Sequence, residues 1–176
     1  MKARSPLARS LVASIPAVVF AIAAAPGVAT ASGNFNSCSV VTRAEAASAL
    51  GQEVTAGVLG HATVEGGLAC VFYGPSVPPT LRNPDVAVGD SVRVVVVKGP
   101  NGLKWYKDYE SKVKAQPVSG VGDKAFFDGY ASLSVLKGSY YLRDAVSPPP
   151  VPSLKQYLQL VLKDEERLAK AILPRL

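Results

Sequence analysis

The chain has 176 residues, of which 19 are Lys or Arg and 13 are Asp or Glu, so its formal net charge at pH 7 is +6. Three of the basic residues fall within residues 1–31, and residues 32–176 keep 16 basic against 13 acidic side chains, a net charge of +3. Nucleic-acid binding normally needs a clustered basic face, so this weak charge argues against it. Residues 32–176 are long enough to form one domain with its own core.

The first 31 residues have the pattern of an export signal. Their three basic residues are Lys2, Arg4 and Arg9. An almost wholly apolar stretch follows from Leu11 to Ala25, and small residues continue to Ala31. This order is typical of a cleaved signal peptide, whereas a membrane-spanning helix needs about 20 apolar residues. We predict cleavage after Ala31 and a secreted, extracellular or envelope location without a stable anchor; a retained leader that acts as an anchor is the alternative.

The chain has two cysteines, Cys38 and Cys70. An exported chain meets an oxidising environment, and an even count without C-x-x-C spacing favours a disulfide over a metal site. A catalytic thiol would instead need a free cysteine and a base. We therefore predict a disulfide between Cys38 and Cys70, which the loop-entropy model values at no more than about 3.7 kcal/mol.

One helix and two strands are expected in the first part of residues 32–176. Thr42 and Glu45 have the spacing of a capping box, and a helix that begins there would end before Gly51, a residue suited to a left-handed cap. Residues 52–58 form a weak predicted strand and residues 68–73 a better one. The disulfide would therefore join the entry of the first helix to a strand.

The middle of the chain is expected to contain a long loop, a strand and a helix. Four prolines interrupt residues 74–90, so this loop has either a binding role or mobility. Ser91–Lys98 is the strongest predicted strand, and its continuous valines indicate a central strand covered on both faces, although polar residues at its start suggest one wet end. A helix is expected over residues 102–115. It carries Lys104, Lys107, Lys112 and Lys114. These lysines either form a solvated face or attract an anionic envelope surface.

The last part of the chain indicates hairpins followed by a helix. Short apolar runs within residues 118–146 predict antiparallel strands joined by tight turns. A proline-rich connector leads to a helix from Ser153 to about Leu173, and Glu165 lies close to its apolar stripe. We therefore expect an α+β fold in which helices pack on a mostly antiparallel sheet. Two similar halves are possible, each a helix followed by three strands, with a closing C-terminal helix. The first half would be helix 42–50 with strands near 54, 70 and 94, and the second helix 102–115 with strands near 126, 134 and 141.

No recognisable catalytic set is present in the sequence. There is no G-x-S-x-G motif, and His61, in a predicted turn, is the only histidine. One histidine and two bridged cysteines supply too few ligands for zinc. The glycines before Asp123 lead into a strand rather than a helix, so they are expected to shape a turn and not a phosphate site. We predict no catalytic residue, metal or cofactor. The candidate binding residues are Asp123, Tyr130 and Tyr140.

Several motifs, taken in order, resemble one protein family. Residues 38–45 read C-S-V-V-T-R-A-E, residues 70–73 read C-V-F-Y, and residues 121–127 read V-G-D-K-A-F-F. They are similar to the secreted proteins and lipoproteins of actinobacteria grouped as a domain of unknown function, with C-x-L-L-T-x-x-E, C-x-Y and G-D-x-A-F/W motifs. The resemblance implies a disulfide, an α+β fold of two similar halves and no catalytic residues. The chain lacks the lipidation cysteine of the lipoprotein members.

These features predict an exported, non-catalytic domain that binds a small ligand or a protein partner in the cell envelope or outside the cell. The alternative is a secreted enzyme of unfamiliar type whose site lies between loop 75–90 and the hairpins of residues 118–146. A third hypothesis is an envelope structural or inhibitor protein that acts through its lysine-rich helix.

Overall fold

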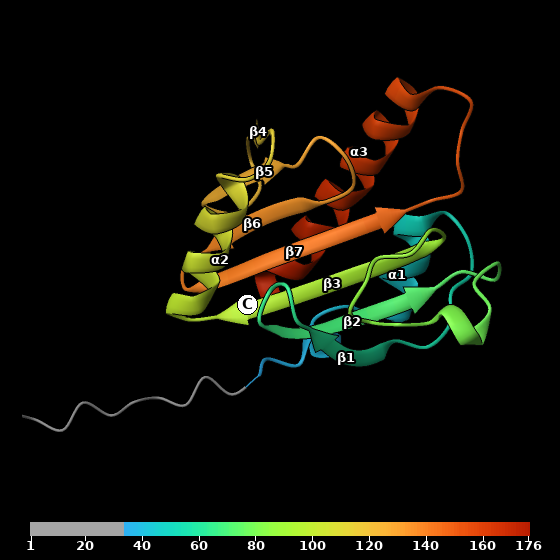
Figure 1. The fold of residues 1–176 in the computed structure, drawn as a ribbon, viewed down its shortest axis with the longest axis horizontal. Coiled ribbons are helices and arrows are strands. Elements are labelled where there is room, and N and C mark those ends of the chain that lie inside the picture. Colours follow the sequence, from blue (N-terminus) through green and yellow to red (C-terminus); the bar gives the residue numbers. More distant parts are fainter. Residues whose placement is uncertain (1–33) are drawn as a thin grey trace, which may run out of the picture. The chain divides into compact units, whose positions relative to one another are not determined.

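The computed structural model describes residues 34–176, so the predicted leader lies outside the described residues. These residues form a seven-stranded antiparallel sheet with the strand order β1-β2-β3-β7-β6-β5-β4 (Figure 1). The strands are β1 (Val58–Ala62), β2 (Gly67–Tyr73), β3 (Ser91–Lys98), β4 (Gln116–Val118), β5 (Lys124–Phe127), β6 (Leu133–Lys137) and β7 (Tyr140–Ser147). The helices are α1 (Arg43–Leu50), α2 (Pro100–Glu110) and α3 (Leu154–Ile172), with short 3-10 helices η1 (Ser37–Ser39), η2 (Pro79–Leu81) and η3 (Leu173–Arg175). The predicted α+β class and C-terminal helix are confirmed.

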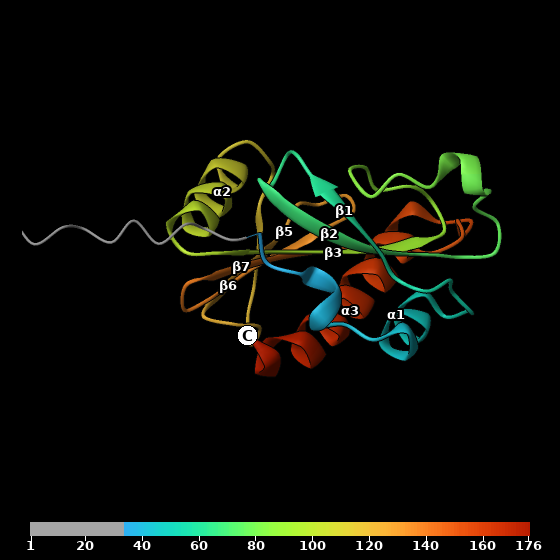
Figure 2. The same ribbon diagram turned by 90° about the horizontal axis from the view of Figure 1, so that it is seen from below.

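Both faces of the sheet are covered. Helices α1 and α3 pack on one face, and α2 lies on the other together with residues 75–90, here termed the proline loop (Figure 2). Strand β3 is central, as predicted, and its residues 91–97 are all buried. The expectation of a wet end is wrong, because Arg93 is only 5 % exposed and is covered by the turn between β1 and β2.

The strands follow a symmetric order, but the helices do not. β1-β2-β3 and β5-β6-β7 lie on either side of the contact between β3 and β7, which agrees with two three-stranded halves. An axis perpendicular to the sheet would relate these halves and would keep their helices on one face. Since α1 and α2 lie on opposite faces, the helices that open the two halves are not related in this way.

Three local predictions were wrong. Residues 52–57 are not a strand; Gly57 passes so close to the disulfide that a Cβ there would lie 2.9 Å from the sulfur of Cys70. His61 lies in β1, exposed, rather than in a turn. Helix α2 ends at Glu110, because the chain then turns and forms β4 along β5.

The predicted disulfide is present and joins η1 to β2. The sulfurs of Cys38 and Cys70 are 2.04 Å apart, and Cys70 is fully buried. Next to the bridge, the hydroxyl of Ser37 donates to the carbonyl of Leu68 (2.5 Å) and accepts from the amide of Val96 (2.9 Å). The segment that enters α1 is therefore fixed to β2 and β3 by a covalent bond and by two hydrogen bonds.

Loss of the disulfide should destabilise the domain through its unfolded state. The double variant C38A/C70A and the reduced wild type should both lose up to about 3.7 kcal/mol in free energy of unfolding, because the unfolded chain regains the freedom of a 33-residue loop. Urea titration followed by circular dichroism measures this. Equal stability of the oxidised and reduced wild type would contradict the prediction.

Candidate functional site

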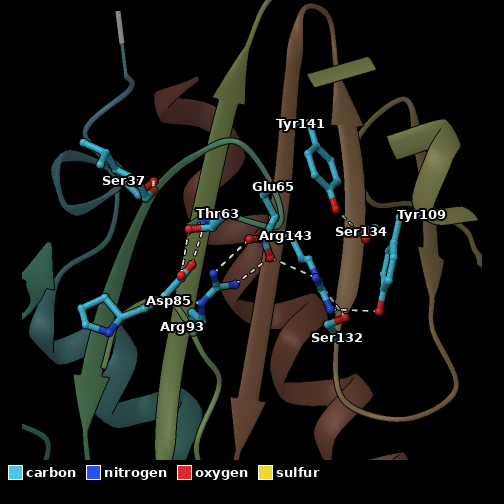
Figure 3. Close-up of polar contacts among 12 residues, drawn as sticks. Ser37, Thr63, Glu65, Asp85, Arg93, Tyr109, Ser132, Ser134, Tyr141 and Arg143 are labelled. Atoms are coloured by element: carbon cyan, nitrogen blue, oxygen red, sulfur yellow. Dashed lines mark hydrogen bonds and ion pairs between the residues drawn. The ribbon is translucent and has the colours of Figure 1, made fainter. Parts of the chain in front are cut away.

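The turn between β1 and β2, residues 63–66, carries Glu65 onto the face of the sheet that α2 covers. The amide and hydroxyl of Thr63 donate to the two carboxylate oxygens of Asp85, at 2.6 and 2.8 Å, which fastens the turn to the proline loop. In Figure 3 the side chain of Glu65 lies between two arginines from the central strands. The turn thus acts as a cover over the middle of the sheet.

Glu65 binds both arginines at short distances. Arg93 on β3 donates through its two terminal nitrogens to both carboxylate oxygens, at 2.7 and 3.0 Å, and through Nε to the carbonyl of Pro84 at 3.0 Å. Arg143 on β7 donates at 2.9 Å to Oε1 of Glu65, the oxygen that also accepts the shorter bond from Arg93. The side chains of Glu65 and Arg93 are only 3 % and 6 % exposed. The buried carboxylate of Glu65 is therefore neutralised by a bidentate ion pair with Arg93 and by a second cation, Arg143.

The hydrogen bonds continue from Glu65 through Arg143 to Tyr109 on α2. Arg143 donates through Nη2 to the phenol oxygen of Tyr109 (2.9 Å) and through Nε to the hydroxyl of Ser132 (3.1 Å), while its guanidinium carbon lies 4.2 Å from the centre of the Tyr109 ring. Tyr109 donates to Asp128 at 2.8 Å, and Asp128 also accepts three backbone amides of residues 130–132. Carboxylates therefore lie at both ends of this chain of hydrogen bonds. We refer to the five residues Glu65, Arg93, Tyr109, Asp128 and Arg143 as the ion network.

The ionisable groups of this network are held in fixed protonation states. Burial alone would raise the pKa of Glu65, but the hydrogen bonds and charge of Arg93 and the charge of Arg143 outweigh it and lower the pKa below the usual value. Burial also opposes ionisation of Asp128, yet its hydrogen bonds lower its pKa. Burial raises the pKa of Tyr109, against the influence of Arg143. At neutral pH the carboxylates are charged and the phenol is neutral.

Helix α2 lies close to the sheet and closes one side of the site. A Cβ at Gly102 would lie 2.6 Å from the carbonyl oxygen of Val97, so only glycine permits this approach. Gly66 has a left-handed φ of 69°, and a Cβ there would lie 2.8 Å from Nε1 of Trp105. These two close approaches allow α2, with Trp105 and Tyr109, to lie against the sheet and the turn 63–66.

A cavity of about 380 Å³ remains between α2 and the turn 63–66, and we call it the α2 pocket. Its walls are Val64, Trp105, Tyr109 and Val113. Its buried lining residues are Glu65 and Tyr141, Arg143 lines it half-buried, and Asp108 and Lys112 lie at its rim. Most of the lining is apolar. The polar groups of Glu65, Tyr109 and Arg143 meet inside the cavity, where they are joined by hydrogen bonds. This combination is typical of small-molecule sites, which range from roughly 300 to 1,000 Å³.

Two larger cavities of the described residues carry less chemistry. A groove of about 520 Å³ between α3 and the edge of the sheet is lined mainly by apolar side chains such as Phe127, Leu158 and Leu162. A cavity of about 440 Å³ lies between the proline loop and residues 148–150. At its base Asp90, with a φ of 58°, accepts hydrogen bonds from Ser76 and from the side chain of Gln52. That carboxylate holds the loop together, so we place the candidate site at the α2 pocket.

Two of the predicted binding residues are close to the turn between β6 and β7. Asp123 directly precedes β5 and contacts this turn, and Tyr140 is the first residue of β7. Asp123 accepts the amide of Gly138 at 2.6 Å and lies 3.7 Å from the ammonium of Lys137, which is a turn-stabilising role. Tyr140 is half-buried and packs edge-on against Phe35, with ring centres 5.8 Å apart. Neither residue lines the α2 pocket.

Tyr130, the third predicted binding residue, is 75 % exposed in the turn between β5 and β6, at the opposite end of β6. The structure therefore does not bring the three candidates together. The cavity beside the proline loop is lined by none of them, nor by any other residue of the hairpins 118–146. The lining of this cavity therefore does not support the alternative enzyme site between loop 75–90 and these hairpins.

Sequence reasoning missed the ion network. Arg93 stands among apolar residues in a predicted strand, a pattern that indicates a buried cation in need of a carboxylate. Arg143 gives a weaker signal, because it follows the apolar run 140–142 and precedes Asp144. Glu65 could not be chosen as the partner, because it is 28 residues from Arg93 and 78 residues from Arg143. Only the pairing of β3 with β7 brings the two arginines under the same turn.

A second pair of ionisable groups, Asp144 and Glu165, is buried on the opposite face of the sheet, beneath α3. Asp144 lies between Val94 and Leu133 in the sheet, and neither of its carboxyl oxygens has a hydrogen-bond partner. Glu165 accepts from the amide of Val146 at 3.2 Å, and its other oxygen has no partner. Both residues are fully buried.

The acid pair is held in its protonated form. Burial raises the pKa of Asp144 well above its usual value. Burial, and then the charge of Asp144, raise the pKa of Glu165 in the same direction. Two charges placed together without a cation in an apolar layer would be very unfavourable, so at least one proton is retained when the domain folds.

The fold and the site together define an antiparallel α+β domain, closed by a disulfide, with a preformed cavity over a buried ion network. No family model matches the sequence. A search of curated proteins also found no match, so the resemblance to the actinobacterial family stays a prediction. Within residues 34–176 no helix is long and apolar enough to cross a membrane. The same residues contain no cluster of three or more His, Cys, Asp or Glu side chains that could hold a metal ion.

Removal of the central carboxylate should be strongly destabilising. Glu65→Gln should lower the free energy of unfolding at pH 7 by about 3–5 kcal/mol, because two buried guanidiniums lose their counter-charge. The folded pKa of Glu65 is lowered, so its contribution exists above the unfolded value and fades as pH falls through the folded value. Denaturant titrations at pH 7 and pH 3 measure the difference. Asp108→Asn, at the exposed rim, is the control and should be almost neutral; an equally mild effect of Glu65→Gln would contradict the prediction.

The acid pair should show the opposite dependence on pH. Because the folded pKa values are raised, the stabilising protonated form is complete below about pH 4 and is lost as pH rises through the folded values. Asp144→Asn should therefore raise the free energy of unfolding by about 1–3 kcal/mol at pH 8 and change it little at pH 4. Glu53→Gln at the surface is the matched control. Destabilisation by Asp144→Asn at both pH values would show that the carboxyl has a partner in the folded protein.

Proposed function

We propose that residues 32–176 act outside the cytoplasm as a non-catalytic binding domain that takes a small ligand in the α2 pocket. The observation that carries the proposal is the cavity of about 380 Å³ whose aromatic walls stand beside a preformed ion network. Such a site is organised before a ligand arrives, so little side-chain ordering is needed on binding. The size of the cavity favours a small ligand over a protein partner.

Two features support a location outside the cytoplasm. The disulfide between Cys38 and Cys70 is typical of proteins in oxidising compartments. Residues 1–31 have the order of basic, apolar and small residues found in export signals. Secretion, or retention in the envelope, therefore accords with the covalent chemistry of the chain.

The protonation states around the pocket support binding rather than catalysis. A general acid or base works best with a pKa near the working pH. Glu65 and Asp128 have lowered pKa values, and Tyr109 has a raised one, so none of them exchanges a proton readily at pH 7. Asp144 and Glu165 have raised pKa values, but both residues are fully buried on the other face of the sheet. The secreted enzyme remains the alternative, and no observation here favours it.

Trp105, the only tryptophan of the chain, provides a direct test because it lines the pocket. A set of small-molecule fragments, titrated into the 32–176 chain, should contain compounds that shift the indole N–H signal of Trp105 in NMR spectra in a saturable way. Val64→Phe, which adds bulk at the mouth of the pocket, should weaken that binding at least tenfold.

Val86→Phe is the matched control. Val64 and Val86 are both exposed, at 58 % and 50 %, but only Val64 lines the pocket. Binding that survives Val64→Phe unchanged, or a fragment set that never moves the indole signal, would overturn the proposed site.

A further inference from the structure

We infer that the α2 pocket selects a small organic anion, a carboxylate with a flat apolar body; this rests on the proposed function of the pocket as a binding site. Among the residues that line the cavity, Arg143 and Lys112 keep unused hydrogen-bond donors, and few side-chain acceptors are free. Most polar side chains around the cavity already have hydrogen-bond partners, and those that do not are mainly donors.

The buried side-chain acceptors of the ion network are already used. Glu65 receives three N–H groups from two guanidiniums, and its side chain is 3 % exposed. Asp128 accepts three amides and two hydroxyls, with 7 % of its side chain exposed. The phenol of Tyr109 donates to Asp128 and accepts from a guanidinium. At the rim, Asp108 is paired with Lys104 at 2.8 Å.

The donors are not all used. A guanidinium carries five N–H groups. Arg143 gives three of them to Ser132, Glu65 and Tyr109, which leaves one on each terminal nitrogen. Its side chain is still 19 % exposed and lines the cavity. Lys112 stands at the rim and forms no ion pair with any residue of the range 34–176.

The charges around the cavity do not cancel completely. In the ion network, two carboxylates balance two guanidiniums, and the pair of Asp108 with Lys104 is neutral. Among the charged residues that line the cavity, Lys112 has no ion-pair partner in the range 34–176, so it places an unpaired positive charge at the rim. A cationic ligand would meet this charge and would find a free acceptor only at the exposed rim, on Asp108, whereas a carboxylate would gain charge-assisted hydrogen bonds from Arg143.

The remaining lining selects the body of the ligand. Val64, Trp105 and Val113 present carbon surface, and the guanidinium carbon of Arg143 lies 4.2 Å from the centre of the Tyr109 ring. Aromatic groups stack on such surfaces and gain from burial of their apolar area. An aromatic carboxylate therefore suits both the walls and the donors.

Three probes of nearly the same shape separate the classes of ligand. Phenylacetate, phenylacetamide and 2-phenylethylamine present a carboxylate, a neutral amide and an ammonium on the same ring. Each is titrated into the 32–176 chain while the indole signal of Trp105 is followed. We expect phenylacetate to bind about tenfold more tightly than phenylacetamide and the amine to be weakest, because hydrogen bonds to a charged acceptor are stronger than neutral ones.

Two lysines of the same segment test the source of the selectivity. Lys112→Gln should weaken phenylacetate about three- to fivefold, the range expected of an exposed charge contact, and should leave phenylacetamide unchanged. Lys107→Gln makes the same change in net charge on α2 but lies outside the pocket. It should change neither affinity. Neither lysine takes part in the ion network, so both variants should fold normally.

Equal binding of all three probes, or tightest binding of the amine, would overturn the carboxylate assignment and leave the pocket itself as a binding site. The same conclusion follows if none of the three moves the indole signal while other fragments do. Equal weakening by Lys112→Gln and Lys107→Gln would show that the net charge of the chain, and not the pocket, attracts the anion.

Discussion

A carboxylate held between two arginines determines how this domain is assembled. Moving a carboxylate or a guanidinium out of water costs several kcal/mol, and this is recovered only when the geometry satisfies every charged group. Glu65 meets that condition because Arg93 binds it with two nitrogens and Arg143 adds a third contact. The same arginines hold the proline loop through Pro84 and α2 through Tyr109. The turn, the loop, the helix and the two central strands are therefore positioned by one set of contacts, and the α2 pocket is the space that they leave.

Strand β7 places two neighbouring charged residues in opposite environments. Arg143 and Asp144 are adjacent in sequence, but alternation along a strand sends their side chains to different faces of the sheet. Arg143 enters the ion network, where carboxylates compensate its charge. Asp144 faces an apolar layer and a second acid, Glu165, with no cation among its partners. One face of the sheet is thus organised by paired charges and the other by apolar packing around a protonated acid pair.

These two faces account for the division of roles in the proposed function. The face beneath α1 and α3 holds the larger apolar cluster and the disulfide, which stabilise the domain whether or not a ligand is bound. The face beneath α2 has a smaller apolar cluster, and its ion network is formed before any ligand is present. A site on such a rigid support loses little conformational freedom on binding. The disulfide also holds the segment before α1 in place, which isolated packing of a short alanine-rich helix would do poorly.

The sequence by itself determined the local elements whose signals are short-range. The capping box of Thr42 with Glu45, the central strand Ser91–Lys98 and the pairing of the two cysteines were all predicted, because each depends on neighbouring residue types or on a count. The two halves were predicted in their strand order, although the first strand begins at Val58 and not near residue 54. They were not predicted in their helices, since a period of apolar residues does not reveal which face of a sheet a helix covers. Asp123 and Tyr140 were selected for their residue types and are used in a turn and in packing.

Only the tertiary structure decided the location of the candidate site. Glu65 is 78 residues from Arg143, and their contact depends on the register of β3 with β7 and on the path of a four-residue turn. The burial of Asp144 opposite Glu165 depends equally on how α3 lies across the sheet. Sequence patterns report the period of an element and its ends, whereas the energy of a charge depends on what surrounds it in three dimensions. For that reason the fold class could be predicted from the sequence and the ion network could not.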